Sequence, residues 1–438
     1  MSIPLPEPTT IMSVEPQPFT IAVPDSELEL LHKKLDLVRL PDELDGAGWD
    51  YGAPLEDIRR LVARWKDGYD WRKAEEGINQ IPQFTRNIIV DGFGTLNIHY
   101  AHQKSSTENA IPLLFIHGWP GHFLEVGKML PLLTAASPDH PSFHVVALSL
   151  PGFGFSEAPK KKGFAGRQYA EVAHRLMVLL GYDEYVIQGG DWGSYIAKIM
   201  AHVYGKRHVK AWHTNFPTAP PPSFRMSPAR YLSFLMTPFT FRERTGLDRS
   251  EWFESKGSGF FREQSTQPQT IGYSLADSPV GLLAWIYEKL VQWADEYPWE
   301  DDEVLTWISV YWFSRAGPAA SVRIYYEVMA VDKLPFVRSL ASSVPLGLSF
   351  FPKEVLVVPK AWTHFIGNVV MQCEHDSGGH FAAHERPGEL AGDIRRMFAK
   401  DGPAYAVVEG KNGYEGPPAL RPTKSIISRA FSRMSSAG

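Results

Sequence analysis

The sequence contains little cysteine, no long apolar run and only a small excess of acidic residues, and each absence excludes a class of protein. Cys373 is the single cysteine and cannot form an internal disulfide; its place at the end of the apolar stretch GNVVMQC predicts a buried side chain rather than a reactive thiol. Apolar stretches such as IPLLFI end within a few residues, whereas a membrane helix needs about 20. The 44 basic and 49 acidic residues give a net charge of −5, which does not favour nucleic acid as a partner.

The two ends of the chain differ in composition from the segments between them. The first residues, MSIPLPEPTTIMSVEPQP, are rich in proline and have neither the basic nor the apolar segment of a signal peptide, so we expect a soluble cytoplasmic protein. Residues 416–438 are basic and rich in serine, and we expect them to form a flexible tail. No group of His, Cys, Asp and Glu has the spacing of metal ligands.

Secondary-structure patterns divide the rest of the chain into segments. Residues 1–85 carry helical patterns, and from 86 to 217 apolar strand patterns alternate with helical ones, which is typical of a parallel sheet covered on both faces. Between 218 and 337 the strand signal is replaced by helical, aromatic patterns, and strand patterns return in 338–415. This order predicts an α/β protein, with an α/β-hydrolase fold, a mostly parallel eight-stranded sheet and a helical cap inserted before the last two strands.

The stretch YVIQGGDWGSYIAKIM, residues 185–200, indicates a strand, a sharp turn and a helix. Glycines lie two residues before and two residues after Asp191, an arrangement that raises the central side chain above the sheet. Most such turns carry a serine nucleophile, and a carboxylate in its place predicts alkyl-ester chemistry rather than acyl transfer. The stretch PGFGFS, 151–156, resembles part of a dinucleotide fingerprint but lacks its third glycine, so it does not favour a Rossmann domain.

A nucleophile at this turn needs a base, an acid that orients the base and donors for an oxyanion. His380 lies in HDSGGHFAAHE after the last strand pattern, and Glu354 lies in FFPKE after the preceding one. Asp376 is closer to His380 in the sequence and competes with Glu354 for the role of acid. The backbone N–H groups of Trp119, in HGWPG, and of Trp192 are placed to form the oxyanion hole.

Taken together, these motifs resemble the epoxide hydrolase family, in the branch that contains microsomal and fungal enzymes. The resemblance covers nearly the whole chain and includes GWDYG and YDWRKAEEGINQIPQF near the N-terminus and SGFFREQSTQPQTIGYSLADSPVGLLAWIYEK in the cap. It implies that residues 1–85 form a meander around the core. It also implies conversion of a small hydrophobic epoxide and water to a vicinal diol without a metal or cofactor, and it is compatible with a homodimer formed through the cap or the meander.

The mechanism implied by the resemblance has two steps. Asp191 attacks an epoxide carbon to form an alkyl-enzyme ester while a phenol from the cap stabilises the departing oxygen. His380, oriented by Glu354, then takes a proton from a water molecule that attacks the carbonyl of the ester.

The expected phenols are where this sequence departs from the family. Tyr325 matches one of two cap tyrosines, but Phe260 stands where the other belongs, and phenylalanine donates no proton. Slower turnover, a substrate that brings its own stabilisation, or a replacement donor such as Tyr273, Tyr326 or water would each be consistent with this. The side chains expected to line the substrate pocket are Phe260, Phe261, Tyr273, Tyr326 and His117.

Other functions fit parts of the same pattern. A haloalkane dehalogenase could use Asp191 with the indole of Trp192 on the halide, but it does not explain Tyr325 or the N-terminal motifs. A specialised enzyme that opens an epoxide intramolecularly would suit Phe260. A serine esterase is disfavoured because the turn has no serine, and a non-catalytic binder would not need a nucleophile, an acid and a base together.

Overall fold

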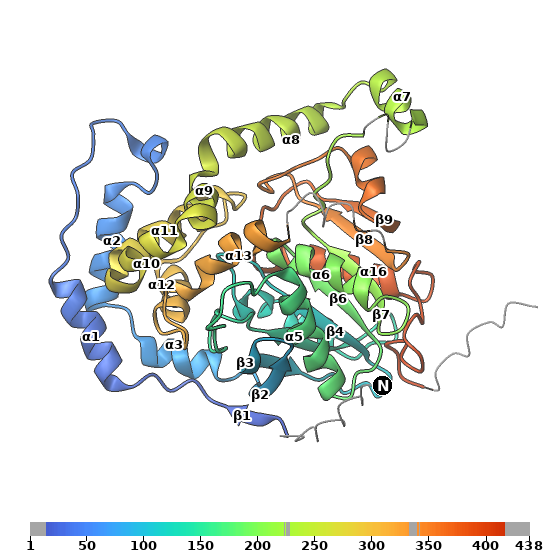
Figure 1. The fold of residues 1–438 in the computed structure, drawn as a ribbon, viewed down its shortest axis with the longest axis horizontal. Coiled ribbons are helices and arrows are strands. Elements are labelled where there is room, and N and C mark those ends of the chain that lie inside the picture. The colour runs from blue at the N-terminus through green and yellow to red at the C-terminus, as the bar shows by residue number, and fades with distance from the viewer. Residues whose placement is uncertain (1–14, 223, 225–227, 333–339, 341, 417–438) are drawn as a thin grey trace, which may run out of the picture.

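The computed structural model describes residues 15–222, 224, 228–332, 340 and 342–416 (Figure 1). Apart from residue 416, the predicted tail lies outside the described residues. The described strands form one nine-stranded sheet in the order β1-β2-β3-β5-β4-β6-β7-β8-β9. Their bounds are Gln17–Phe19 (β1), Gln83–Val90 (β2), Gly94–Gln103 (β3), Ile111–Ile116 (β4), Phe143–Leu148 (β5), Tyr185–Gly189 (β6), Val209–Thr214 (β7), Pro345–Phe350 (β8) and Asn368–Glu374 (β9).

The sheet has an antiparallel edge and a parallel centre. β1, β2, β3 and β5 pair in antiparallel fashion, and the strands from β5 to β9 run parallel in the order above. The α/β-hydrolase fold predicted from the sequence is confirmed. The described sheet has one strand more than the predicted eight, because the short strand β1 pairs with β2 at the edge.

Helices cover both faces of the sheet and fill the insertion between β7 and β8. The described α-helices are Asp25–Asp36 (α1), Leu55–Asp67 (α2), Trp71–Ile78 (α3), Leu130–Thr134 (α4), Gly166–Leu179 (α5), Trp192–Val203 (α6), Pro228–Met236 (α7), Phe241–Trp252 (α8), Gly259–Thr266 (α9), Pro268–Asp277 (α10), Pro279–Gln292 (α11), Asp301–Trp312 (α12), Arg323–Val331 (α13), Ala382–Glu385 (α15) and Pro387–Phe398 (α16). The helices from α7 to α13 form the cap, so the predicted insertion before the last two strands is confirmed.

The side chains of the apolar strand β4 contribute to two hydrophobic cores, one on each face of the sheet. All six of its residues are buried, as expected for a parallel strand with helices on both faces. Because side chains alternate along a strand, Leu114 and Ile116 join the core that contains α5 and α6, whereas Leu113 and Phe115 join the core that contains α4 and α16. Cys373 is buried in β9, as predicted.

The helices of the N-terminal segment pack against the cap. Helix α2 buries Ile58, Leu61 and Trp65, which are three or four residues apart and therefore lie on one side. Figure 1 shows α10, α11 and α12 between this segment and the core. A bidentate ion pair joins Arg64 of α2 to Asp302 of α12, with both N···O distances 2.8 Å. No helix in the described part of the chain is long and apolar enough to cross a lipid bilayer.

Candidate active site

The turn between β6 and α6 has the strained backbone expected of a nucleophile's position. Asp191 has φ +48° and ψ −125°, a conformation that non-glycine residues rarely adopt. A Cβ atom at residue 189 would lie 2.5 Å from the backbone of residue 193, and one at residue 193 would collide with the carbonyl of Ile116. Glycine is therefore required on both sides of Asp191, because strand and helix approach each other too closely for a side chain.

The two predicted oxyanion donors lie at this turn. The backbone N–H of Trp119 donates to Oδ1 of Asp191 at 2.8 Å, and the backbone N–H of Trp192 also bonds to the carboxylate. The N–H of Trp119 holds Oδ1, whereas Oδ2 lies 3.7 Å from Nε2 of His380. The arrangement can stabilise negative charge on Oδ1 when the carboxyl group is attacked.

His380 joins the carboxylate of Asp191 to that of Glu354. Its Nδ1 lies 2.5 Å from Oε1 of Glu354, and its Nε2 lies 3.7 Å from Oδ2 of Asp191. Because an ionised carboxylate can only accept, Nδ1 carries a proton and Nε2 faces the reacting side. Asp376, the competing acid, is instead exposed and pairs with Arg242 at 3.1 Å.

The two carboxylates determine the charge on the imidazole. Burial lowers the pKa of His380, but Glu354 and then Asp191 outweigh it and raise the pKa to about 9. Burial raises the pKa of Asp191 above its usual value, although His380 and the two backbone N–H groups oppose this. At neutral pH the unreacted site therefore holds a protonated imidazole between two carboxyl groups.

A cavity of about 530 Å³ opens above Asp191. Phe260 and Phe261 of α9 and Tyr325 of α13 form its cap side. Trp293, which follows α11, packs against both Phe260 and His380, with ring centroids 5.0 and 4.9 Å apart. Further apolar side chains in the wall are Trp192, Tyr195, Trp212, Phe216, Phe253, Val355, Leu356 and Ile366.

Three residues predicted to line this cavity lie outside it. Tyr273 is 70% exposed on α10, and Tyr326 is 43% exposed on the outer side of α13, so neither phenol replaces the missing donor at the position of Phe260. His117 is buried beneath the turn, where Nδ1 lies 2.9 Å from the carbonyl of Gly118 and Nε2 accepts from the N–H of Leu150 at 3.1 Å. These contacts use both ring nitrogens, so His117 supports the backbone around the oxyanion donors.

Tyr325 is the phenol that faces Asp191. Its ring meets those of Phe260 and Trp192 edge to face, with centroids 5.8 and 4.9 Å apart. Burial and the charge of Asp191 raise the pKa of Tyr325 well above its usual value. The phenol is therefore neutral at working pH and can donate a hydrogen bond to an oxygen bound above Asp191.

Two buried acids near the site were missed in the sequence, although each lies in or close to a motif that contains predicted residues. Glu125 lies four residues after HGWPG, and burial raises its pKa to about 8; His380 opposes this and Asp191 adds to it. Glu385 ends the stretch GGHFAAHE and accepts hydrogen bonds from backbone N–H groups on both sides of His380. Their closeness to these motifs was the available signal.

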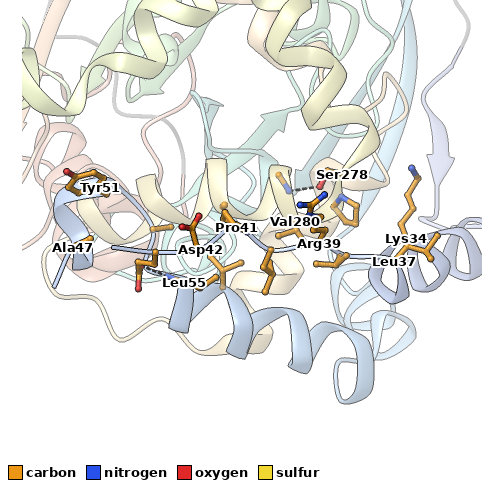
Figure 2. A pocket seen from close by; sticks show the side chains of 18 of the residues that line it. Lys34, Leu37, Arg39, Pro41, Asp42, Ala47, Tyr51, Leu55, Ser278 and Val280 are labelled. Carbon is orange, nitrogen blue, oxygen red and sulfur yellow. Dashed lines mark hydrogen bonds between the residues drawn. The ribbon is translucent and has the colours of Figure 1, made fainter. Parts of the chain in front are cut away.

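A second cavity of about 730 Å³ lies between the segment that follows α1 and the junction of α10 and α11 (Figure 2). Among the lining residues labelled in Figure 2, Leu37, Pro41 and Leu55 belong to the N-terminal segment, and Ser278 and Val280 belong to the junction of α10 and α11. This cavity contains none of the residues that surround Asp191. Within the described ranges, no cluster of three or more His, Cys, Asp or Glu side chains could hold a metal ion.

Comparison with known protein families connects both parts of the chain to one group of enzymes. The family model described as "Epoxide hydrolase N terminus" matches residues 16–126, and the one described as "alpha/beta hydrolase fold" matches residues 111–300. Epoxide hydrolase 1 of Sus scrofa is 35% identical over 411 residues, which cover 87% of this chain and 88% of that protein.

Solved structures show the same similarity in three dimensions. The epoxide hydrolase of Aspergillus niger is 35% identical with a TM-score of 0.75, and the match covers 87% of this chain and 95% of that one. The juvenile hormone epoxide hydrolase of the silkworm Bombyx mori is 27% identical with a TM-score of 0.79, and the match covers 87% and 93% of the two chains.

Proposed function

This chain belongs to the microsomal-type epoxide hydrolases, and we propose that Asp191, His380 and Glu354 carry out its reaction in two steps. An epoxide and water are the reactants that membership of the family implies. The supporting observation is the chain of contacts from Glu354 through His380 to Asp191, at 2.5 and 3.7 Å. A carboxylate, an imidazole and a second carboxylate in this order supply a nucleophile, a base and the group that orients the base.

In the first step Oδ2 of Asp191 attacks an epoxide carbon. The new C–O bond forms as the ring C–O bond breaks, and the electron pair of that bond moves to the epoxide oxygen. Tyr325 donates its phenol proton to this oxygen, which becomes a hydroxyl group, and the phenolate regains a proton in the second step. Because Trp119 holds Oδ1, the attacking oxygen is the one that faces the cavity.

In the second step water hydrolyses the ester. Nε2 of His380 removes a proton from water as the water oxygen attacks the ester carbonyl of Asp191. The carbonyl oxygen becomes negative beside the N–H groups of Trp119 and Trp192, and it returns to a carbonyl as the alkoxide of the diol leaves and takes the proton from His380. The second proton of the water remains on the carboxyl group of Asp191 and passes to the phenolate of Tyr325, which restores both side chains. Esterification also removes the negative charge of Asp191, one of the charges that raise the pKa of His380.

The substrate is a hydrophobic epoxide in this proposal. The cavity wall is mainly aromatic and aliphatic. Its polar and charged residues other than Asp191 are Ser194, Lys198, Thr218, Glu254, Ser258 and Arg262. Such a wall binds apolar groups by removing their surface from water and leaves orientation to Tyr325 and the nucleophile.

The proposal is tested by trapping the ester in a His380→Gln variant. The variant is incubated with styrene oxide or a stilbene oxide, and the peptide that contains Asp191 is examined by mass spectrometry. An added mass equal to that of the epoxide, stable for minutes, is expected because the base of the second step is missing. The matched control is His384→Gln, since His384 is also a buried histidine beside a carboxylate, Glu303, at 2.7 Å. The control should turn over without accumulating ester; an unmodified Asp191 peptide in folded His380→Gln would refute the proposal.

A further inference from the structure

The loop that carries His380, residues 378–381, is held by all four of its backbone N–H groups. That of Gly378 donates to Oδ2 of Asp295 at 2.7 Å, and that of His380 donates to the carbonyl of Trp293 at 2.9 Å. Both acceptors lie just after α11, in the cap. The loop of residues 378–381 is therefore hydrogen-bonded to the cap as well as to the core of the protein.

Glu385 makes the remaining contacts. Its Oε1 accepts from the N–H of Phe381 at 2.9 Å, and its Oε2 accepts from the N–H groups of Gly379 and Asp295 at 3.1 and 2.8 Å. The side chain is only 8% exposed. One buried carboxylate thus joins the residues on both sides of His380 to the cap.

The path of the loop requires glycine at two positions. Gly378 has φ +109°, and a Cβ atom at residue 379 would collide with the carbonyl of Trp293. Glycines allow the backbone to approach the cap but supply no side chain to fix it. Hydrogen bonds fix the loop instead: the N–H of Lys353 donates to the carbonyl of Gly378 at 3.0 Å on the core side, and the contacts of Glu385 and of residues 293–295 fix it on the cap side.

We propose that Glu385 is a positioning residue for the ester-hydrolysis step, because its carboxylate holds the loop of His380 against residues 293–295 of the cap. The inference rests on the proposed roles of Asp191 and His380. The first step depends on Asp191, the N–H of Trp119 and the phenol of Tyr325, and none of the contacts of Glu385 involves these groups. The loss of Glu385 therefore slows the step that uses the imidazole.

The test is Glu385→Gln, because glutamine has nearly the same shape but cannot accept all three N–H groups. In glutamine an NH₂ group takes the place of one carboxylate oxygen. This NH₂ group is a donor and cannot accept a hydrogen bond from the backbone N–H that it then faces. Asp393→Asn is the matched control: Asp393 is a buried carboxylate that accepts from Ser349 and His375, away from the loop. Wild type, both variants and His380→Gln are mixed with styrene oxide, quenched at successive times and analysed for ester on the Asp191 peptide.

In Glu385→Gln the ester should form within about threefold of the wild-type rate but decay about 10²-fold more slowly, since a displacement of about 1 Å at a reacting group can cost that much. Asp393→Asn should decay as the wild type does. Wild-type decay in Glu385→Gln, or equal losses in both steps and in the folded fraction measured by circular dichroism, would overturn the role of Glu385. Absence of ester in His380→Gln would instead refute the proposed function on which the inference rests.

Discussion

Neutralising Asp191 should convert His380 from a protonated imidazole to an efficient base. In the free site the pKa of His380 is about 9, so about 1% of the imidazole is neutral at pH 7. The ester of the intermediate carries no charge. Asp191→Asn also places an uncharged side chain beside His380, and unlike the ester this side chain is not consumed during the titration. We therefore expect the pKa of His380 to be lower in Asp191→Asn than in the wild type.

The size of the effect follows from the distance between the two side chains. Nε2 of His380 and Oδ2 of Asp191 are 3.7 Å apart. At an effective dielectric constant of about 20, opposite unit charges at this distance attract by about 4 kcal/mol, which corresponds to roughly a thousand-fold change in the protonation equilibrium. Glu354 is unchanged in the variant and keeps its part in raising the pKa of His380.

The protonation of His380 can be followed by NMR titration of the imidazole in wild type and Asp191→Asn, with His380→Gln used to assign the signals. Decay of the trapped ester gives an independent measure, because its rate should increase with pH through the protonation midpoint of His380 in the esterified enzyme. That midpoint should lie below pH 9. Equal titration midpoints in wild type and variant, or a decay rate that increases only above pH 9, would refute the reasoning.

Three further changes have expected outcomes. Phe260→Tyr adds a second phenol to the cavity wall, so ester formation in quenched single turnovers should become up to about a hundredfold faster, and an unchanged rate would mean that this phenol does not reach the epoxide oxygen. Tyr325→Phe should slow ester formation about 10²- to 10³-fold and leave ester decay unchanged, and a selective effect on decay would contradict the assigned role. Glu303→Gln should lower the free energy of unfolding at pH 7 by about 1.5–3 kcal/mol. Burial raises the pKa of Glu303, but hydrogen bonds from His384 and Lys128 hold the pKa at about 2, so its contribution is complete above about pH 4.5 and lost as pH falls towards 2; a thermal-unfolding difference as large at pH 2 as at pH 7 would contradict this.

The parts of the site that follow from local backbone geometry could be predicted from the sequence. The close approach at Asp191 requires glycines at fixed offsets, and these are visible in QGGDWGS. Glu354 and His380 come after consecutive strands of a parallel sheet, whose carboxyl ends lie at one edge, so their proximity follows from the order of the chain. The sequence left the choice between Glu354 and Asp376 open, because distance along the chain does not show which way a side chain points.

What could not be predicted depends on the orientation of helices and on backbone contacts between distant segments. Tyr325 and Tyr326 are adjacent, but successive residues on a helix point about 100° apart, so only one faces the cavity. Which one does so depends on how α13 packs. Strand β1 has only three residues in a proline-rich stretch, too few for an alternating pattern. The contacts of Glu385 are to backbone N–H groups, which leave no trace in the identities of the residues that donate them.

The attachment of the His380 loop to residues 293–295 limits how the cap can be exchanged between related enzymes. A chimaera that takes its cap from a relative would bring a new wall for the substrate, but it would also bring new acceptors for the N–H groups of Gly378 and His380. Substrate range and the alignment of the base are thus inherited together. Grafts that keep residues 293–295 from the recipient would allow the two properties to be engineered separately.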